Sequence, residues 1–175
     1  MNDVINKDIF TESSLRYIVR SEAIDNTFDL ICDEETFTVL NESKAKLTAA
    51  FAIEEAFELL IRNFKEYELE VLSVSSEISL HDNLEYIDWF DSKIRINQRI
   101  SNLLTSFRAY IYYCKHNAKT LLDVENGNTL VDRLFELEFD QHFEYRFCEK
   151  LRNFVQHQSL AIHHVTQGGQ WVQEL

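Results

Sequence analysis

The residues of this sequence best suited to chemistry stand close together in the segment EKLRNFVQHQSLAIHH, where Arg152 and Asn153 are followed by His157. An imidazole titrates near neutral pH, so a histidine can take the proton of a ribose 2′-hydroxyl or protonate a leaving 5′-oxygen. The guanidinium of an arginine can hold the phosphate while negative charge develops on it. These residue types therefore fit RNA cleavage that needs no metal.

The spacing of these three residues predicts that one chain alone makes an incomplete site. On an ideal helix Asn153 and His157 share a face, whereas Arg152 lies about 140° from His157 and must reach across with its long side chain. Two such helices, placed antiparallel across a two-fold axis, would bring two arginines and two histidines into one cleft.

The segment 152–157 resembles the signature of the HEPN family. That signature is an arginine, usually followed by Asn, Asp or His, and then a histidine after four to six intervening residues. Arg152 and His157 satisfy it with four intervening residues, and Asn153 supplies the polar second position. The wider resemblance, two long helices followed by a helix that bears the motif, covers about residues 43–164.

The resemblance implies a metal-independent endoribonuclease that leaves a cyclic phosphate and acts as a homodimer. Arg152 and His157 would be the principal catalytic pair, and Asn153 would position the histidine or the phosphate. Such an enzyme would be a toxin or antiviral effector, with RNA as its substrate and an antitoxin or effector protein as a further partner. No metal and no cofactor are expected.

Two other interpretations of the same residues stay open. Arg152 could instead pair with a neighbouring acid such as Glu149, in which case the motif is structural. The chain would then be a non-catalytic helical interaction or dimerisation module whose acidic first half binds a basic protein partner. His142, His157, His163 and His164 could suggest a metal site, but no acid or cysteine accompanies them at ligand spacing.

Charge is distributed unevenly along the chain. The sequence holds 30 acids against 17 Lys and Arg, yet residues 92–122 contain six bases and no acid. A locally positive surface can guide RNA even on an acidic protein. We therefore predict that this region contributes substrate-binding residues, namely Arg95, Arg99, Arg108, Lys115 and Lys119; the alternative is a solvated helix face that balances the acidic helix before it.

The hydrophobic pattern changes its period along the first 121 residues. Residues 15–40 alternate apolar and polar side chains in the runs SLRYIVR, FDLIC and FTVL, which predicts a small β-meander or hairpin. Apolar residues then recur at three- and four-residue spacing, which predicts long helices over about 43–78 and about 83–121. Asp82 or Asn83 could cap the second helix.

A turn separates these helices from the rest of the chain. In the segment DVENGN, Asn126 and Gly127 predict a turn because a glycine adopts positive φ without steric cost. Thr129 or Asn128 would cap a third helical stretch, which carries the motif and is predicted to break near 138–142.

The composition favours a single, mainly α domain. The sequence has no proline and three glycines, so few residues break helices. We predict one domain over 1–175: a small β or irregular element over 1–40, a HEPN-like up-and-down bundle of three to four long helices over 41–165, and a tail over 166–175. No run of about 18 apolar residues occurs and the first residues include acids, so we predict no membrane span, no signal peptide and a cytoplasmic location.

Overall fold

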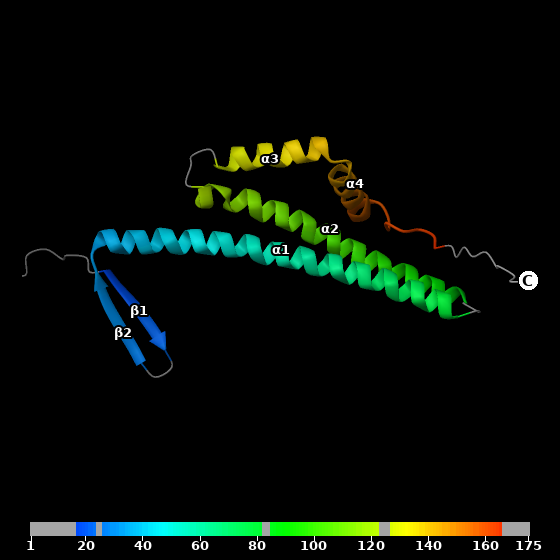
Figure 1. Cartoon of the computed structure of the whole chain (residues 1–175), viewed down its shortest axis with the longest axis horizontal. Coiled ribbons are helices and arrows are strands. Elements are labelled where there is room, and N and C mark those ends of the chain that lie inside the picture. Colours follow the sequence, from blue (N-terminus) through cyan, green and yellow to red (C-terminus); the bar gives the residue numbers. More distant parts are fainter. Residues whose placement is uncertain (1–16, 24–25, 82–84, 123–126, 166–175) are drawn as a thin grey trace, which may run out of the picture. The chain divides into compact units, whose positions relative to one another are not determined.

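The computed structural model describes residues 17–23, 26–81, 85–122 and 127–165. Two strands are followed by four helices in the order β1, β2, α1, α2, α3, α4 (Figure 1). The predicted fold class is confirmed: the chain is mainly α, with an up-and-down helical arrangement and a small two-stranded sheet near the N-terminus. Two of the four helices are long, with 47 and 37 residues, and two are short, with 15 residues each.

The N-terminal sheet is a hairpin of β1 (Tyr17–Ala23) and β2 (Asn26–Cys32). The strands pair antiparallel with Tyr17 opposite Cys32, and a cross-strand ion pair joins Arg20 to Asp29 at 2.7 Å. This confirms the predicted hairpin for the first two apolar runs.

The third apolar run, FTVL at 37–40, is not a strand, and this part of the prediction is wrong. It lies in α1 (Glu34–Leu80), which begins nine residues before the predicted start at 43. The cause is a cap: a carboxylate oxygen of Asp33 accepts the backbone N–H of Thr36 at 2.7 Å. An N-cap of this kind satisfies a donor of the first turn and starts a helix, whatever the strand propensity of the residues that follow.

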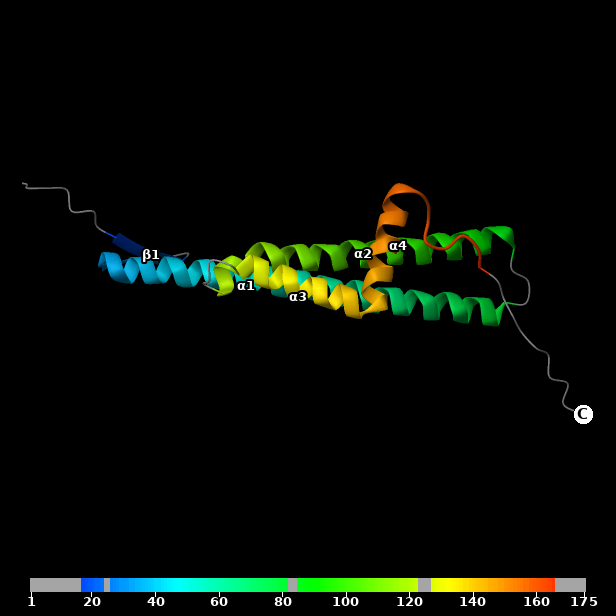
Figure 2. The same cartoon turned by 90° about the horizontal axis from the view of Figure 1, so that it is seen from above.

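From Thr48 onward, α1 runs side by side with α2 (Tyr86–Leu122), in opposite directions (Figure 2). The bounds of α2 agree with the prediction to within three residues, and the proposed caps at 82 and 83 lie outside the described residues. The buried residues of α2 include Leu104, Ile111 and Ala118, seven residues apart. This spacing keeps one stripe of a helix in contact with a neighbour over many turns.

Ion pairs between α1 and α2 connect the halves of these helices nearest the loop between them. Arg95 contacts Glu70 and Glu77, each at 2.7 Å. Arg99 contacts Glu66 at 2.6 Å and Glu70 at 3.3 Å. The hydrogen bond from Arg95 lowers the pKa of Glu77 to about 2, so this carboxylate is ionised at neutral pH and holds Arg95.

The third helix, α3 (Gly127–Gln141), starts one residue before the predicted cap Asn128 and two before the alternative cap Thr129. Gly127 is its first residue and does not have positive φ, so that reason for the glycine is wrong. A Cβ at this position would lie 3.0 Å from the carbonyl oxygen of Ala118 and 3.1 Å from Cα of Lys119. The glycine is therefore required because the backbone of α3 approaches that of α2 closely.

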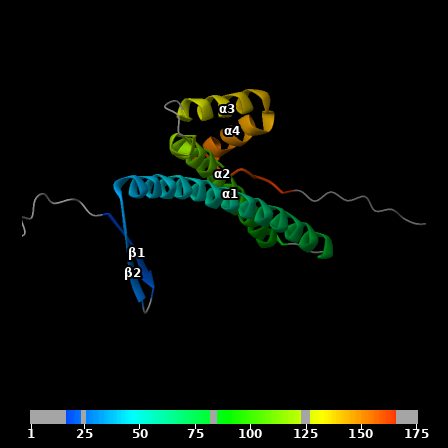
Figure 3. The same cartoon turned by 60° about the vertical axis from the view of Figure 1, so that its left-hand side comes forward.

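The last helix, α4 (Phe143–His157), follows a break at His142, which has an extended backbone. The predicted break near 138–142 is thereby confirmed. The guanidinium of Arg146 donates hydrogen bonds to the carbonyl oxygens of Phe139 at 2.9 Å and Asp140 at 2.6 Å, which satisfies two of the carbonyls that the end of α3 leaves unpaired. Figure 3 shows α3 and α4 joined at this corner, both adjacent to α2.

The chain divides into two compact units, Met1–Leu47 and Thr48–Leu175, and α1 runs through both. The motif and all five predicted RNA-binding residues belong to the second unit. Among the described helices, none has a stretch long and apolar enough to span a bilayer.

Candidate functional site

The motif lies in the C-terminal half of α4, and His157 is the last residue of that helix. Its three side chains differ in exposure: Arg152 is half-buried, whereas Asn153 and His157 are exposed. Since α4 packs on α2 and α3, the arginine lies toward the body of the bundle and the histidine lies on its outer side. This is the separation of faces that the helical spacing predicts.

Arg152 contacts the neighbouring Asn153. Its Nη1 donates a hydrogen bond to the amide oxygen of Asn153 at 3.2 Å. Its Nε is buried and has no hydrogen-bond partner among the described residues. The long side chain thus bends toward the exposed face that carries Asn153 and His157, and one of its donors is still unused.

The alternative partner considered for Arg152 is wrong. Glu149 does not pair with Arg152; it pairs with Arg108 of α2, whose Nη1 lies 3.0 Å from the carboxylate. The side chain of Glu149 is only 17% exposed, and its carboxylate is already paired with Arg108. Arg152 has no ion pair within the part of the chain that the structure describes.

Four of the described arginines are half-buried, and Arg152 differs from the other three. Arg95 and Arg99 contact carboxylates, and Arg146 donates to two backbone carbonyls. Arg152 contacts the neutral amide of Asn153 instead. A buried donor without a partner costs about 1–3 kcal/mol. The chain has more acids than bases, so a carboxylate partner for Arg152 would not be scarce. Among the described residues, Arg152 therefore has no carboxylate to release when it binds an anion, but its unpaired Nε is itself buried, and an anion from outside the chain would contact the terminal nitrogens.

The N-terminal half of α4 is fixed on α2 by packing and charge. The ring of Tyr145 packs edge to face on Phe107, with centroids 5.3 Å apart, and on Phe139 at 5.5 Å. Burial raises the pKa of the Tyr145 hydroxyl, as expected for a phenol that packs into an apolar cluster. Together with the Arg108–Glu149 pair, this cluster sets the position of the helix that carries the motif.

The C-terminal end of α4 is fixed by a residue that sequence reasoning missed. Beyond His157 the chain turns back, and the backbone of Ile162 makes two hydrogen bonds to the side-chain amide of Asn97 on α2, each at 2.9 Å. In the same segment the ring of His163 packs edge to face on Phe154, with centroids 6.1 Å apart. The available signal was a lone polar residue inside the apolar series of the second helix.

The predicted RNA-binding residues are not gathered in one groove. Arg95 and Arg99 face α1, where they pair with three of its glutamates. This placement agrees with the alternative given above, in which the basic region balances the acidic helix before it.

The other predicted RNA-binding residues lie toward α3 and α4. Arg108 pairs with Glu149 of α4, and Lys115 pairs with Asp132 of α3 at 2.6 Å. Lys119 is exposed in the last turn of α2. Of these three, Arg108 is the nearest to the motif along α4, because its partner is one helical turn before Arg152.

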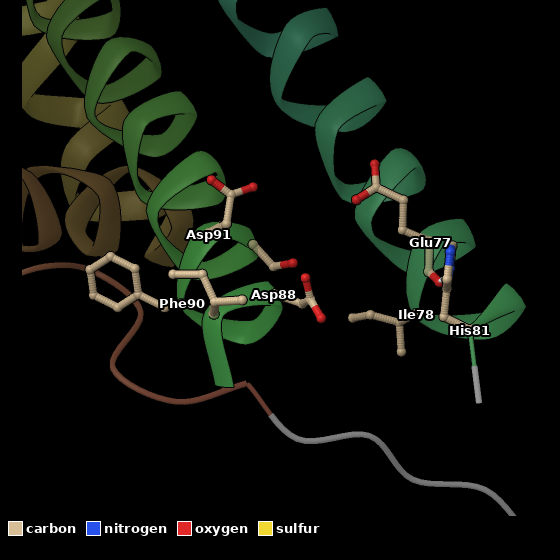
Figure 4. Close-up of a pocket in the computed structure, with 8 residues that line it drawn as sticks. Glu77, Ile78, His81, Asp88, Phe90 and Asp91 are labelled. Atoms are coloured by element: carbon tan, nitrogen blue, oxygen red, sulfur yellow. Dashed lines mark hydrogen bonds between the residues drawn. The ribbon is translucent and has the colours of Figure 1, made fainter. Parts of the chain in front are cut away.

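A separate cleft lies where the C-terminal end of α1 faces the N-terminal end of α2 (Figure 4). It has a volume of 710 Å³, and its polar lining includes Glu77, His81, Asp88 and Asp91. Glu77 is held by Arg95, and Nδ1 of His81 lies 2.9 Å from the carbonyl oxygen of Glu77. The cleft contains none of the motif residues.

Metal-binding geometry does not occur among the described residues: no three His, Cys, Asp or Glu side chains are placed to hold one ion. The four histidines weighed above are divided between the two ends of α4 and the segment after it. His142 lies 3.1 Å from Glu138, and His163 packs on Phe154. The histidines therefore have separate surroundings.

Comparison with known proteins found no relative of this chain. No family model matches the chain, and no curated protein or solved structure matches it either.

Proposed function

We propose that this protein is a metal-independent endoribonuclease of the HEPN type that acts as a homodimer. Arg152 and His157 would be its catalytic pair, and Asn153 would hold Arg152 in place. The proposal extends to a cytoplasmic toxin or antiviral effector, controlled by an antitoxin or effector protein. The observation that carries it is the state of Arg152, a half-buried guanidinium with an unpaired Nε, which lies five residues before an exposed histidine on the same helix.

The chemistry follows from the two side-chain types. One imidazole takes the proton of the ribose 2′-hydroxyl, and the 2′-oxygen attacks the adjacent phosphorus. The bond from phosphorus to the 5′-oxygen breaks, and that oxygen receives a proton from a second imidazole. The products are a 2′,3′-cyclic phosphate and a 5′-hydroxyl. The guanidinium of Arg152 would bind the non-bridging oxygens, where negative charge increases in the transition state.

A second copy supplies what one chain lacks. The mechanism uses two imidazoles, and each α4 has one at its C-terminal end. The exposed face of α4 also carries Phe143 and Phe147, which are 65% and 52% exposed and have ring centroids 6.0 Å apart. Burying such rings against another copy is favourable by about 1.5–3 kcal/mol for each, which supports assembly through α4.

The test is cleavage of an end-labelled RNA by purified wild type and His157→Ala, with EDTA present throughout. We expect cleavage by the wild type with a cyclic phosphate at the new 3′ end, and its loss in the variant. His164→Ala is the matched control, because it removes an exposed histidine from the same region and leaves the motif intact. An RNA with a 2′-deoxy residue at the cleavage point should resist the wild type, since it lacks the attacking oxygen.

Equal cleavage by wild type and His157→Ala would refute the proposal. The oligomeric state is measured in parallel by light scattering, because a variant that fails to dimerise would also lose activity. Mixing the wild type with an excess of His157→Ala offers a further check. Because the proposed site takes one imidazole from each copy, mixed dimers should be inactive, and activity should fall below the share of wild-type chains.

A second candidate function is that of a non-catalytic helical interaction module. It is favoured by an open apolar groove of 310 Å³ between α1, α2 and α3, lined by Ile53, Cys114, Ala118, Leu121, Leu122, Val131, Leu134, Phe135 and Glu138. Next to this groove α3 exposes Leu130, Leu134 and Leu137 along one stripe. A basic amphipathic helix of a partner protein would fit such a surface.

The two candidates differ in what Arg152 does. In the interaction module the arginine is structural, so Arg152→Ala lowers stability and wild type cleaves no RNA. In the ribonuclease the same substitution removes an unpaired donor, so cleavage is lost while the melting temperature hardly changes. Calorimetry and the cleavage assay on one preparation separate these outcomes.

A further inference from the structure

Asn97 is one of three buried polar residues of α2 and is 3% exposed. Its side-chain Nδ2 donates to the carbonyl oxygen of Lys93 at 2.8 Å and to that of Ile162 at 2.9 Å. Its Oδ1 accepts the backbone N–H of Ile162 at 2.9 Å. The amide of Asn97 therefore binds both backbone groups of Ile162, a residue 65 positions away in sequence.

An amide is the side-chain group that matches this contact. The backbone of Ile162 presents one donor and one acceptor, and the amide of Asn97 offers it an acceptor and one of its two donors in the same plane. A carboxylate would supply acceptors alone, and an aliphatic side chain would leave both backbone groups unpaired at a cost of about 1–3 kcal/mol for each.

Two sets of contacts with α2 flank the motif. Asn97 binds the backbone of Ile162, after the motif, and Phe107 and Arg108 contact residues of α4 before it. The second set fixes the N-terminal half of α4 through Tyr145 and Glu149. Along α2, Asn97 and Arg108 are about 16 Å apart at 1.5 Å per residue. The helix end that carries His157 and the turn after it are thus held between two fixed points on one long helix.

The turn itself is short and hydrogen-bonded. The N–H of Gln158 donates to the carbonyl of Phe154 at 2.8 Å, which closes α4 just after His157. Four residues later the chain reaches Ile162, and the next residue, His163, packs on Phe154. Few backbone conformations can satisfy both ends of such a segment, so a constraint at Ile162 also restricts the position of His157.

We propose that Asn97 is a positioning residue of the candidate site: by holding the backbone of Ile162 it fixes the C-terminal end of α4 and so the place of His157. The inference rests on the proposed function for its catalytic consequence, but the positioning itself can be measured without any cleavage. It assigns to a buried asparagine of α2 the role of supporting a histidine with which it makes no hydrogen bond.

The test uses Asn97→Asp and Asn97→Leu in the full chain. Asp retains an acceptor for the N–H of Ile162 but loses both donors, whereas Leu loses the whole contact. Asn117→Asp and Asn117→Leu are the matched controls, since the amide of Asn117 also donates to a carbonyl four residues earlier in α2, at 2.9 Å, and makes no hydrogen bond to another of the described segments. Ile162→Pro removes the N–H from the opposite side and leaves α2 unchanged, in case the Asn97 variants do not fold.

Two measurements report on position directly. Hydrogen exchange of the amides over 158–165 should become faster in the Asn97 variants and in Ile162→Pro, with the amide of Ile162 least protected in Asn97→Leu. The imidazole resonances of His157 and His163 should move in these variants and stay in place in the Asn117 controls.

The kinetic consequence is a split between kcat and KM. A displaced histidine lowers kcat, by about tenfold or more for a shift near 1 Å, while RNA binding through other groups keeps KM near the wild-type value. If exchange rises but the His157 resonance and kcat do not change, Asn97 is a structural residue and the inference is overturned. The same holds if the Asn117 variants have equal effects.

Failure of the proposed function would look different. If the wild type cleaves no RNA, the ribonuclease proposal fails, and the His157 resonance then decides the positioning role alone. A moved resonance supports it, and an unmoved one overturns it.

Discussion

Arginines occupy two contrasting environments in this molecule. At the α1–α2 contact, Arg95 and Arg99 are surrounded by three glutamates at distances from 2.6 to 3.3 Å. On α4, Arg152 is similarly half-buried, yet it contacts one neutral amide and keeps an unpaired Nε. The first environment satisfies every charge within the chain, and the second does not.

The difference separates arginines that pair with carboxylates of their own chain from one that contacts a neutral amide and has no ion pair among the described residues. An arginine whose donors all meet carboxylates of its own chain can reach an external phosphate only by breaking those contacts. Arg152 makes no ion pair with the described residues, so binding a phosphate through its terminal nitrogens would break none, whereas its buried Nε is out of reach of such a ligand. The basic region 92–122 that the sequence marks as a candidate RNA surface is therefore a weaker candidate than the motif, because at least four of its six bases make ion pairs with the described residues.

The largest expected effect is on cleavage by Arg152→Ala. Loss of a charge-stabilising donor in the transition state should reduce kcat/KM by about 100- to 1000-fold, while the free energy of unfolding stays within about 1 kcal/mol of wild type. The measurements are single-turnover cleavage and urea denaturation followed by circular dichroism. Arg133→Ala, which removes an exposed arginine of α3, should leave both unchanged.

Arg95→Ala should show the opposite pattern. Its removal leaves Glu70, whose side chain is 13% exposed, with one cation in place of two. We expect the free energy of unfolding to fall by about 2 kcal/mol, less than for a fully buried pair because the Arg95 side chain is 29% exposed. Cleavage per folded molecule should match the wild type.

The control for this variant is Arg62→Ala, which breaks an exposed pair with Glu58 on the surface of α1 and should change stability by less than about 0.5 kcal/mol. A cleavage defect in Arg95→Ala without loss of stability would contradict the comparison. Arg95 would then be a substrate-binding residue, as the charge pattern of the sequence suggests.

A smaller and opposite change in stability is expected from Arg152→Met. Methionine keeps most of the aliphatic stem of this half-buried side chain and removes the buried Nε that has no partner. The free energy of unfolding should rise by about 1 kcal/mol, and cleavage should be lost as in Arg152→Ala. A decrease in stability of similar size would show that the guanidinium has a structural partner, and would favour the interaction module.

The helices could be predicted from the sequence because their signals are local. The absence of proline and the three- and four-residue spacing of apolar side chains located α2 to within three residues and the break before α4. The start of α1 was missed because FTVL has the composition of a strand, and the cap at Asp33 that places it in a helix involves one hydrogen bond. Gly127 was assigned to a turn because its close approach to α2 depends on tertiary structure.

The candidate site was predictable in part for the same reason. Spacing on one helix placed Arg152 and His157 on different faces, and the structure agrees. The partners of the basic residues could not be predicted, since Glu149 and Asp132 meet α2 through the packing of α3 and α4. Asn97 was missed because its contact with Ile162 joins two segments that no periodic pattern connects.

The smallest expected effect concerns the acid dependence of the α1–α2 contact. Hydrogen bonds from Arg95 and Ser73 hold the pKa of Glu77 at about 2, below its ordinary value of 4.5. A carboxylate with a lowered pKa in the folded chain stabilises that chain above its ordinary pKa, and the contribution is lost as the pH falls toward the folded value. The urea midpoint of the wild type should therefore fall as the pH is lowered from 4.5 to about 2, the range between these two values.

Glu77→Gln should reduce this dependence, because the variant has no carboxylate to protonate at the contact. Glu68→Gln serves as the control, since it removes an exposed glutamate of the same helix that makes no ion pair with the described residues. Midpoints measured at several pH values for the three proteins decide the matter. If wild type and Glu77→Gln lose stability in parallel as the pH falls, the ion pairs of Arg95 contribute little to the fold, and the distinction drawn between the two arginine environments would have to rest on cleavage alone.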